Sequence, residues 1–138
     1  MRRFLLAGFF CAILLAADTY PRQPGIDALH YTFKLTLSDD TDEISGEASV
    51  EFRFLKDDVA TVALDLATNM TVTEVTSAGT TIAFTHGSDR LVITLSSPPR
   101  AGELRQFTIR YHGVPADGLR IGTNKYGERT FFSQNWPR

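Results

Sequence analysis

Apolar and polar side chains alternate along the chain from residue 28 to residue 37. In the stretch ALHYTFKLTL the apolar positions are Leu29, Tyr31, Phe33, Leu35 and Leu37. Successive side chains of a β-strand point to opposite faces, so this pattern predicts a half-buried strand with one solvent-exposed face. A second alternation, EISGEASVEFRF, has its apolar positions at Ala48, Val50, Phe52 and Phe54. The acidic turn SDDTDE joins the two runs, which together predict an antiparallel hairpin.

Shorter alternating or β-branched runs follow at regular spacing, each bounded by turn residues. They cover residues 61–66, 70–79, 80–87, 90–95 and 105–113. No window with helical periodicity and helix caps appears after residue 18. Many short strands separated by turns predict an all-β fold, either a sandwich or an open curved antiparallel sheet. Gly46, inside the second strand, indicates a bulge or a close approach of another group to the backbone.

The first 17 residues, MRRFLLAGFFCAILLAA, have the layout of an export signal. Arg2 and Arg3 precede an unbroken apolar run that ends in small residues and is short for a membrane span. We expect a signal-peptide helix that is cleaved near Ala17 and a protein exported to the periplasm or the outside of the cell. The alternative is an uncleaved anchor, which would be the chain's sole connection to a membrane.

Cleavage would leave one domain, residues 18–138. The single cysteine, Cys11, lies in the apolar run, so the mature domain would contain neither a disulfide nor a reactive thiol. Loss of Arg2 and Arg3 leaves 12 basic against 16 acidic residues, a net charge of about −4. Without a basic cluster, binding to nucleic acid is disfavoured.

Side chains suited to catalysis are sparse. His30 and His112 fall on the polar phase of predicted strands, His86 falls in a predicted turn, and no H-E-x-x-H occurs. The adjacent pairs Asp39–Asp40 and Asp57–Asp58 are best explained as surface turns. The acidic turn does not have the spacing of a calcium loop. Residues 18–121 thus predict a secreted β domain without an active site of its own.

Three segments, in order, resemble the N-terminal domain of gluzincin-type zinc aminopeptidases, the aminopeptidase N and leukotriene hydrolase family. The first is IDALHYTFKLTLS with ISGEASVEFRF, and the second runs from VALDL through LVITL to AGELRQFTIRYHGVPADGL. The third is GERTFFSQNWP, which is similar to a hairpin written T-Q-x-E-P in many members. The resemblance spans residues 26–138.

The resemblance implies a curved, saddle-like β-sheet that packs against a thermolysin-like catalytic domain following in the same chain. In the family that domain carries the zinc ligands, in H-E-x-x-H and a further Glu, together with a G-x-M-E-N strand. None of these motifs occurs here, so we expect a fragment of a larger enzyme that acts on peptide substrates. Zinc would be bound by the missing catalytic domain and not by these 138 residues.

The resemblance also implies two substrate-binding residues. Gln134 matches the hairpin glutamine that lines the pocket for the first side chain of the substrate. Trp136 stands where the family commonly has Glu or Gln near the substrate's free amino group. An indole offers a π face and one N–H donor but no carboxylate, which puts amine recognition by this domain in doubt. For both residues the alternative role is packing between domains.

A second function also fits the sequence, namely a self-sufficient secreted β-sandwich that serves as a binding or adhesion module without catalysis.

Overall fold

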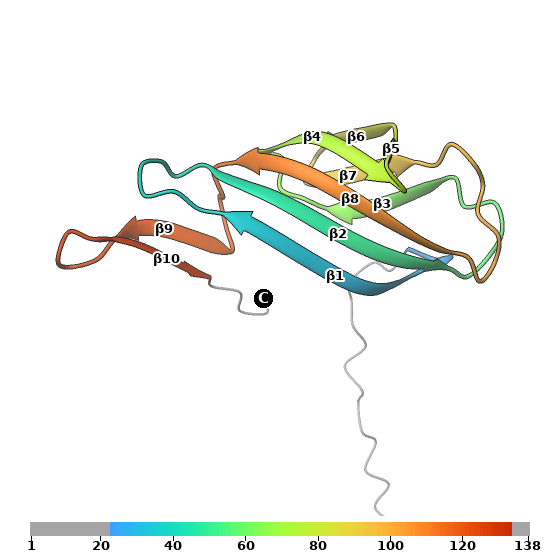
Figure 1. The fold of residues 1–138 in the computed structure, drawn as a ribbon, viewed down its shortest axis with the longest axis horizontal. Helices are drawn as coiled ribbons and strands as arrows, with labels where there is room; N and C mark the ends of the chain where they lie inside the picture. Colours follow the sequence, from blue (N-terminus) through green and yellow to red (C-terminus); the bar gives the residue numbers. More distant parts are fainter. Residues whose placement is uncertain (1–22, 134–138) are drawn as a thin grey trace, which may run out of the picture.

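The computed structural model describes residues 23–133, which form two packed β-sheets and a projecting hairpin (Figure 1). Within this range there is no helix, and the sheets are antiparallel and do not close into a barrel, as expected for an all-β sandwich. The strands are β1 (Ile26–Thr36), β2 (Ile44–Phe54), β3 (Thr61–Asp65), β4 (Met70–Ser77), β5 (Thr80–Thr81), β6 (Phe84–Gly87), β7 (Arg90–Thr94), β8 (Leu104–Gly113), β9 (Leu119–Thr123) and β10 (Arg129–Ser133).

The larger sheet has the strand order β1-β2-β8-β4-β5. The predicted hairpin is confirmed, because β1 pairs with β2 in antiparallel register across the acidic turn. The strand β8 lies between β2 and β4, and Ala48 and Val75 both face Ile109 in its two ladders. The centre of this sheet is therefore assembled from segments that are far apart in sequence.

The smaller sheet has the order β3-β7-β6. Residues 80–87, expected as one strand, instead divide between the sheets: β5 pairs with β4, and β6 pairs with β7. Residues 82 and 83 connect β5 to β6, and each bonds to the backbone of a different sheet. Ile82 N–H donates to the Val75 carbonyl at 2.8 Å, and the Ala83 carbonyl accepts from Thr94 N–H at 2.8 Å. One short segment therefore ties the two layers together.

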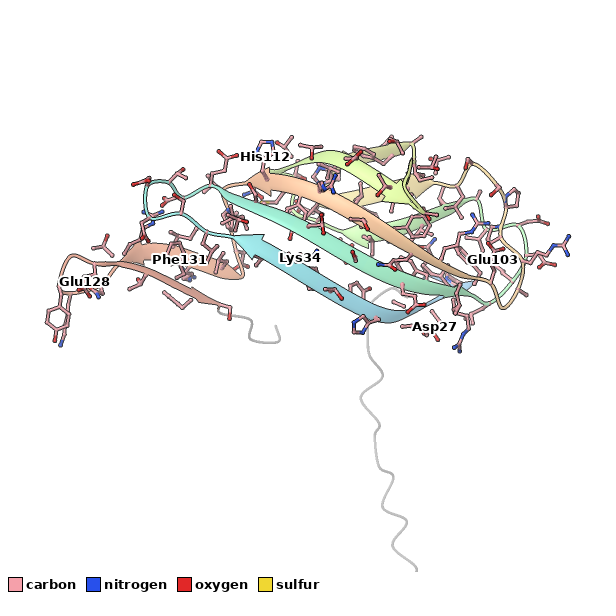
Figure 2. The ribbon with its side chains drawn as sticks, viewed as in Figure 1. Asp27, Lys34, Glu103, His112, Glu128 and Phe131 are labelled. Atoms are coloured by element: carbon pink, nitrogen blue, oxygen red, sulfur yellow. The ribbon has the colours of Figure 1, made fainter. Side chains whose placement is uncertain are left out.

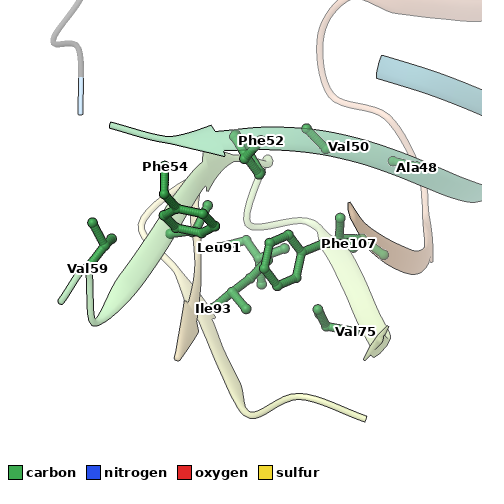
Figure 3. Packing of buried hydrophobic residues seen from close by; sticks show 11 residues of the cluster. Ala48, Val50, Phe52, Phe54, Val59, Val75, Leu91, Ile93 and Phe107 are labelled. Carbon is green, nitrogen blue, oxygen red and sulfur yellow. The ribbon is translucent and has the colours of Figure 1, made fainter. Parts of the chain in front are cut away.

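The core lies between the two sheets (Figure 3). All four apolar positions predicted for β2 are buried, and they meet Phe107 and Ile109 from β8 and Leu91 and Ile93 from β7. In β4, Val72 and Val75 are three residues apart, a spacing that in a regular strand would place them on opposite faces. Both nevertheless contact the core. A register shift between Val72 and Glu74 supplies the extra residue, as a β-bulge does.

Gly46 marks a close approach and not a bulge, since the ladders of β2 are regular on both sides of it. A Cβ atom at this position would lie 2.2 Å from Cζ of Tyr111, whose ring crosses the strand there. Burial of this ring raises the pKa of the Tyr111 hydroxyl. Only a residue without a side chain leaves room for that ring.

The prediction that β1 is half buried is wrong. Its residues after Ile26 are exposed, and Phe33 retains 60% of its accessible surface. The apolar side chains of Tyr31 and Phe33 lie opposite the buried Val50 and Ala48, so they continue the core face. As an edge strand, β1 has a neighbour on one side only, and Leu29 falls in a bulge.

The expected signal-peptide helix at residues 1–17 lies outside the described residues. Within residues 23–133, no helix is long and apolar enough to cross a bilayer.

Candidate functional site: the β9–β10 hairpin and its surroundings

The outer face of the larger sheet carries a row of paired charges. Lys34 Nζ lies 2.9 Å from one carboxylate oxygen of Glu47, and Arg110 Nε lies 3.2 Å from the other. Arg110 also reaches Glu74 at 2.7 Å. Hydrogen bonds from Lys34 and then Arg110 lower the pKa of Glu47, and Glu47 and Glu74 raise that of Arg110. These exposed pairs form a solvated face, as cross-strand charges commonly do.

The three histidines lie apart from one another. His86 lies in β6 and not in the predicted turn, with Nε2 3.0 Å from the Leu66 carbonyl. His112 pairs with the Glu43 carboxylate at one end of the sheet, and His30 is exposed on β1. Within residues 23–133, no three His, Cys, Asp or Glu side chains cluster so that they could hold a metal ion. The described residues thus do not fit a zinc site.

A hollow of about 790 Å³ opens beside β4, β5 and β8. Its charged groups are engaged with each other: Arg105 Nε lies 2.6 Å from Glu103, and the same guanidinium donates to the Ser97 carbonyl at 2.8 Å. Hydrogen bonding to Arg105 lowers the pKa of Glu103. The two charged side chains that line this hollow, Glu103 and Arg105, are thus engaged in contacts within the protein.

The last described element is the β9–β10 hairpin, which lies beside the β1–β2 turn (Figure 1). Its turn, NKYGE, is closed by the Asn124 carboxamide oxygen, which accepts from the N–H groups of Tyr126 and Glu128 at 2.9 and 3.0 Å. Gly127 adopts φ of 86°, a left-handed conformation that glycine tolerates. Figure 2 shows Glu128 at the hairpin tip and Phe131 nearer the β1–β2 turn. The hairpin is thus a locally well-specified element.

Arg129 connects this hairpin to the β1–β2 turn. Its guanidinium donates to the Ser38 carbonyl at 3.1 Å, to the Thr41 carbonyl at 2.6 Å and to the Asp42 carboxylate. It also lies 5.5 Å from the centroid of the Phe131 ring. Residues 129 and 131 therefore face the sandwich, while Phe132, on the opposite face of the strand, is exposed. Arg129 was not among the residues predicted from the sequence.

Both predicted substrate-binding residues, Gln134 and Trp136, lie outside the described residues. What the structure describes is the strand that leads to them: β10 ends at Ser133, the residue before Gln134. The predicted roles of Gln134 and Trp136 stay predictions.

The sequence matches no protein-family model and no curated protein. Solved structures of M1 zinc metallopeptidases do match. One from Deinococcus radiodurans is 25% identical with a TM-score of 0.60, over 74% of this chain and 24% of that chain. A mutant from the same organism bound to a Tyr-Ser-Ala substrate is 23% identical with a TM-score of 0.60, over 72% and 22% of the two chains.

A mutant of a two-domain M1 zinc metallopeptidase bound to L-tryptophan is 24% identical with a TM-score of 0.62. The alignment covers 73% of this chain and 23% of that one. This chain therefore spans about a quarter of the length of the structures that it matches. It has the fold of one part of these M1 zinc metallopeptidases.

Proposed function

We propose that this chain is the N-terminal, substrate-capping domain of a secreted zinc metallo-aminopeptidase, an enzyme that removes N-terminal residues from peptides. The observation that supports it is the fold shared with M1 zinc metallopeptidases, of which this chain covers only about a quarter. The catalytic region would then be a thermolysin-like domain of the same chain, outside these 138 residues. Export is proposed from the signal-like residues 1–17 alone.

In this proposal the domain contributes binding and not bond cleavage. Zinc, held by the catalytic domain, would supply Lewis-acid activation of water. The hairpin would present Gln134 to the first side chain of the peptide. Trp136 would offer its indole face to the substrate's ammonium group, an interaction of about 0.5–2 kcal/mol depending on desolvation.

The apolar face of β1 would form the docking surface for the catalytic domain. Tyr31, Phe33 and Leu35 are exposed on the core side of the sheet, and the exposed Phe132 lies on the neighbouring hairpin. Covering a large apolar side chain stabilises an association by about 1.5–3 kcal/mol. Exposed apolar patches of this kind commonly mark interaction sites.

The test is an extended chain that continues through the downstream reading frame. It should hydrolyse aminoacyl-anilides, and a chelator should abolish the activity. Gln134→Ala should raise KM by about tenfold with a smaller change in kcat, because it removes binding that ground and transition states share. Lys125→Ala, at the exposed hairpin tip, is the matched control and should leave KM unchanged.

Two results would contradict the proposal. One is a downstream reading frame without a metallopeptidase sequence, combined with a 138-residue chain that purifies as a stable monomer, as a stand-alone binding module would. The other is zinc-dependent hydrolysis by the 138-residue chain itself, which would place the active site within this domain.

A further inference from the structure

The smaller sheet ends in a free edge at β3. Among the described residues, β3 pairs with β7 alone, so its other side faces outward. Just beyond the strand, Leu66 N–H bonds on the β7 side, to the Asp89 carbonyl at 3.0 Å. The direction of backbone groups alternates along a strand. Those of Thr61, Ala63 and Asp65 therefore point to the free side.

The side chain of Gln23 already occupies one position of this edge. Its carboxamide donates to the Thr61 carbonyl at 2.8 Å and accepts from the Ala63 N–H at 2.9 Å. These are the donor and the acceptor that a residue of a neighbouring strand would present to β3. The carboxamide therefore stands in for a peptide backbone, and its two bonds show that the edge accepts a partner from this side.

The next donor and acceptor along β3 have no partner in the described part of the chain. The Ala63 carbonyl and the Asp65 N–H repeat the spacing of the pair that Gln23 binds, and no other group of residues 23–133 bonds to them. Backbone groups left unpaired along an exposed edge are a template for another strand. A further strand can therefore pair with β3 at this position.

A groove runs beside this edge, between β3 and the core-side face of β1. It consists of a hollow of about 420 Å³ and a second one of about 100 Å³, and Tyr31, Leu64 and Asp65 line both. Tyr31 and Phe33 continue the core face of the larger sheet, yet they are 46% and 60% exposed. A strand in this groove would cover these rings with alternate side chains while its backbone bonds to β3.

We propose that the β3 edge and this groove dock an extended segment of the catalytic region of the parent chain, which joins the smaller sheet as a fourth strand. The inference rests on the proposed function and names how that region binds to this domain. The segment would carry apolar side chains at alternate positions, to cover Tyr31 and Phe33.

Charge complementarity adds a basic side chain to the chemistry of this segment. The Asp65 carboxylate is exposed and has no ion pair among the described residues. Arg90, its partner in the ladder, belongs to β7, on the opposite side of β3 from the added strand. Opposite charges on directly facing strand positions stabilise the pairing, so a Lys or Arg of the segment would face Asp65.

Two observations favour a segment of the same chain as the occupant. This chain spans about a quarter of the length of the M1 zinc metallopeptidases that it matches, so a long polypeptide is available outside it. The last described strand, β10, is tied through Arg129 to the β1–β2 turn. The polypeptide that follows Ser133 thus starts from an element attached to β1, the strand that forms one wall of the groove.

The first measurement compares amide hydrogen exchange in the 138-residue chain and in the extended enzyme. The Asp65 amide should exchange about tenfold more slowly in the extended enzyme, because a backbone hydrogen bond then protects it. The Ala63 amide, already bonded to Gln23, is the internal reference and should change little. In the 138-residue chain, Gln23→Ala should speed exchange at Ala63 and leave Asp65 as it was, which shows that single edge bonds are resolved.

The second measurement removes the proposed bond from the extended enzyme. Asp65→Pro deletes the N–H that points to the added strand and spares the ladder to β7, since proline is tolerated where the N–H faces away from the sheet. The uncovered apolar groove should then raise binding of the dye anilinonaphthalene sulfonate about threefold or more. Asp65→Ala keeps the N–H and is the matched control, with a smaller rise. Unchanged exchange of the β2 and β8 amides would show that both variants are folded.

The outcomes separate the inference from the function on which it rests. An extended wild-type chain without zinc-dependent peptidase activity contradicts the proposed function itself. With an active wild type, equal exchange of the Asp65 amide in the two chains overturns the docking mode alone. An unchanged dye signal in folded Asp65→Pro overturns it as well.

Other occupants of the groove give results of their own. Protection of the Asp65 amide that appears in the 138-residue chain and grows with its concentration would assign the edge to a second copy and overturn the inference. If Asp65→Pro does not fold, the exchange comparison between the two unaltered chains decides by itself.

Discussion

At the scale of single residues, Gly46 shows how one missing side chain permits a packing arrangement. The Tyr111 ring occupies the space that a Cβ atom would need. We expect Gly46→Ala to destabilise the domain by about 1–3 kcal/mol, as overpacking does. Urea unfolding would measure this loss.

Gly87→Ala is the matched control, because Gly87 lies in a strand where an added Cβ meets no atom within 4 Å. Its effect should stay below that of Gly46→Ala. Adding Tyr111→Leu to Gly46→Ala should cost less than the sum of the two single changes, since the clash requires both groups. Additive effects would show that the ring is not the source of the destabilisation.

At the scale of elements, β1 is an edge strand with two different faces. Phe33 lies on the exposed apolar face, while Thr32 shares the outer face with Lys34 and its paired charges. We expect the 138-residue chain to self-associate through the apolar face, and Phe33→Asp to shift it toward monomer in sedimentation. The neighbouring change Thr32→Asp should leave the association unchanged; an equal effect of both would point to the strand edge instead.

Alternation in the sequence predicts strands well and their surroundings less well. The period identifies which side chains share a face, and this is why the core positions of β2 are predicted correctly. It does not show which sheet a strand joins, so the division of residues 80–87 was missed. Nor does it show which strand stands at the edge of a sheet, so the exposure of Phe33 on β1 was missed too.

The contacts of the candidate site could not be predicted from the alternation of apolar and polar residues. Arg129 binds backbone carbonyls on a turn about 90 residues earlier, and carbonyl acceptors carry no sequence signature. Gln134 and Trp136 were identified through resemblance to a family, and they lie beyond the described strand β10.

At the scale of the whole molecule, one core serves both sheets. Phe107 is 1% exposed and contacts the Phe52 ring at 6.1 Å between centroids. We expect Phe107→Ala to cost about 3–5 kcal/mol, a large share of the 5–15 kcal/mol that typically stabilises a domain. Near-ultraviolet and far-ultraviolet circular dichroism should report one shared transition in urea.

Phe132→Ala provides the control at equal side-chain size, because Phe132 is 52% exposed on the hairpin. Its effect on the unfolding midpoint should be small. Separate transitions for the two probes in Phe107→Ala would show that the sheets unfold independently, contrary to a common core.

The insertion of β8 between β2 and β4 has a consequence for how the chain acquires its structure. The strand β2 precedes its partner β8 by about 60 positions. The ladder between them can therefore form only after most of the domain has been synthesised. Contacts of such long sequence separation make folding slow, because a large loop must close first. A nascent chain that ends before residue 104 would lack the strand that joins β2 to β4, so the edges of both strands would stay unpaired and their apolar faces open to aggregation.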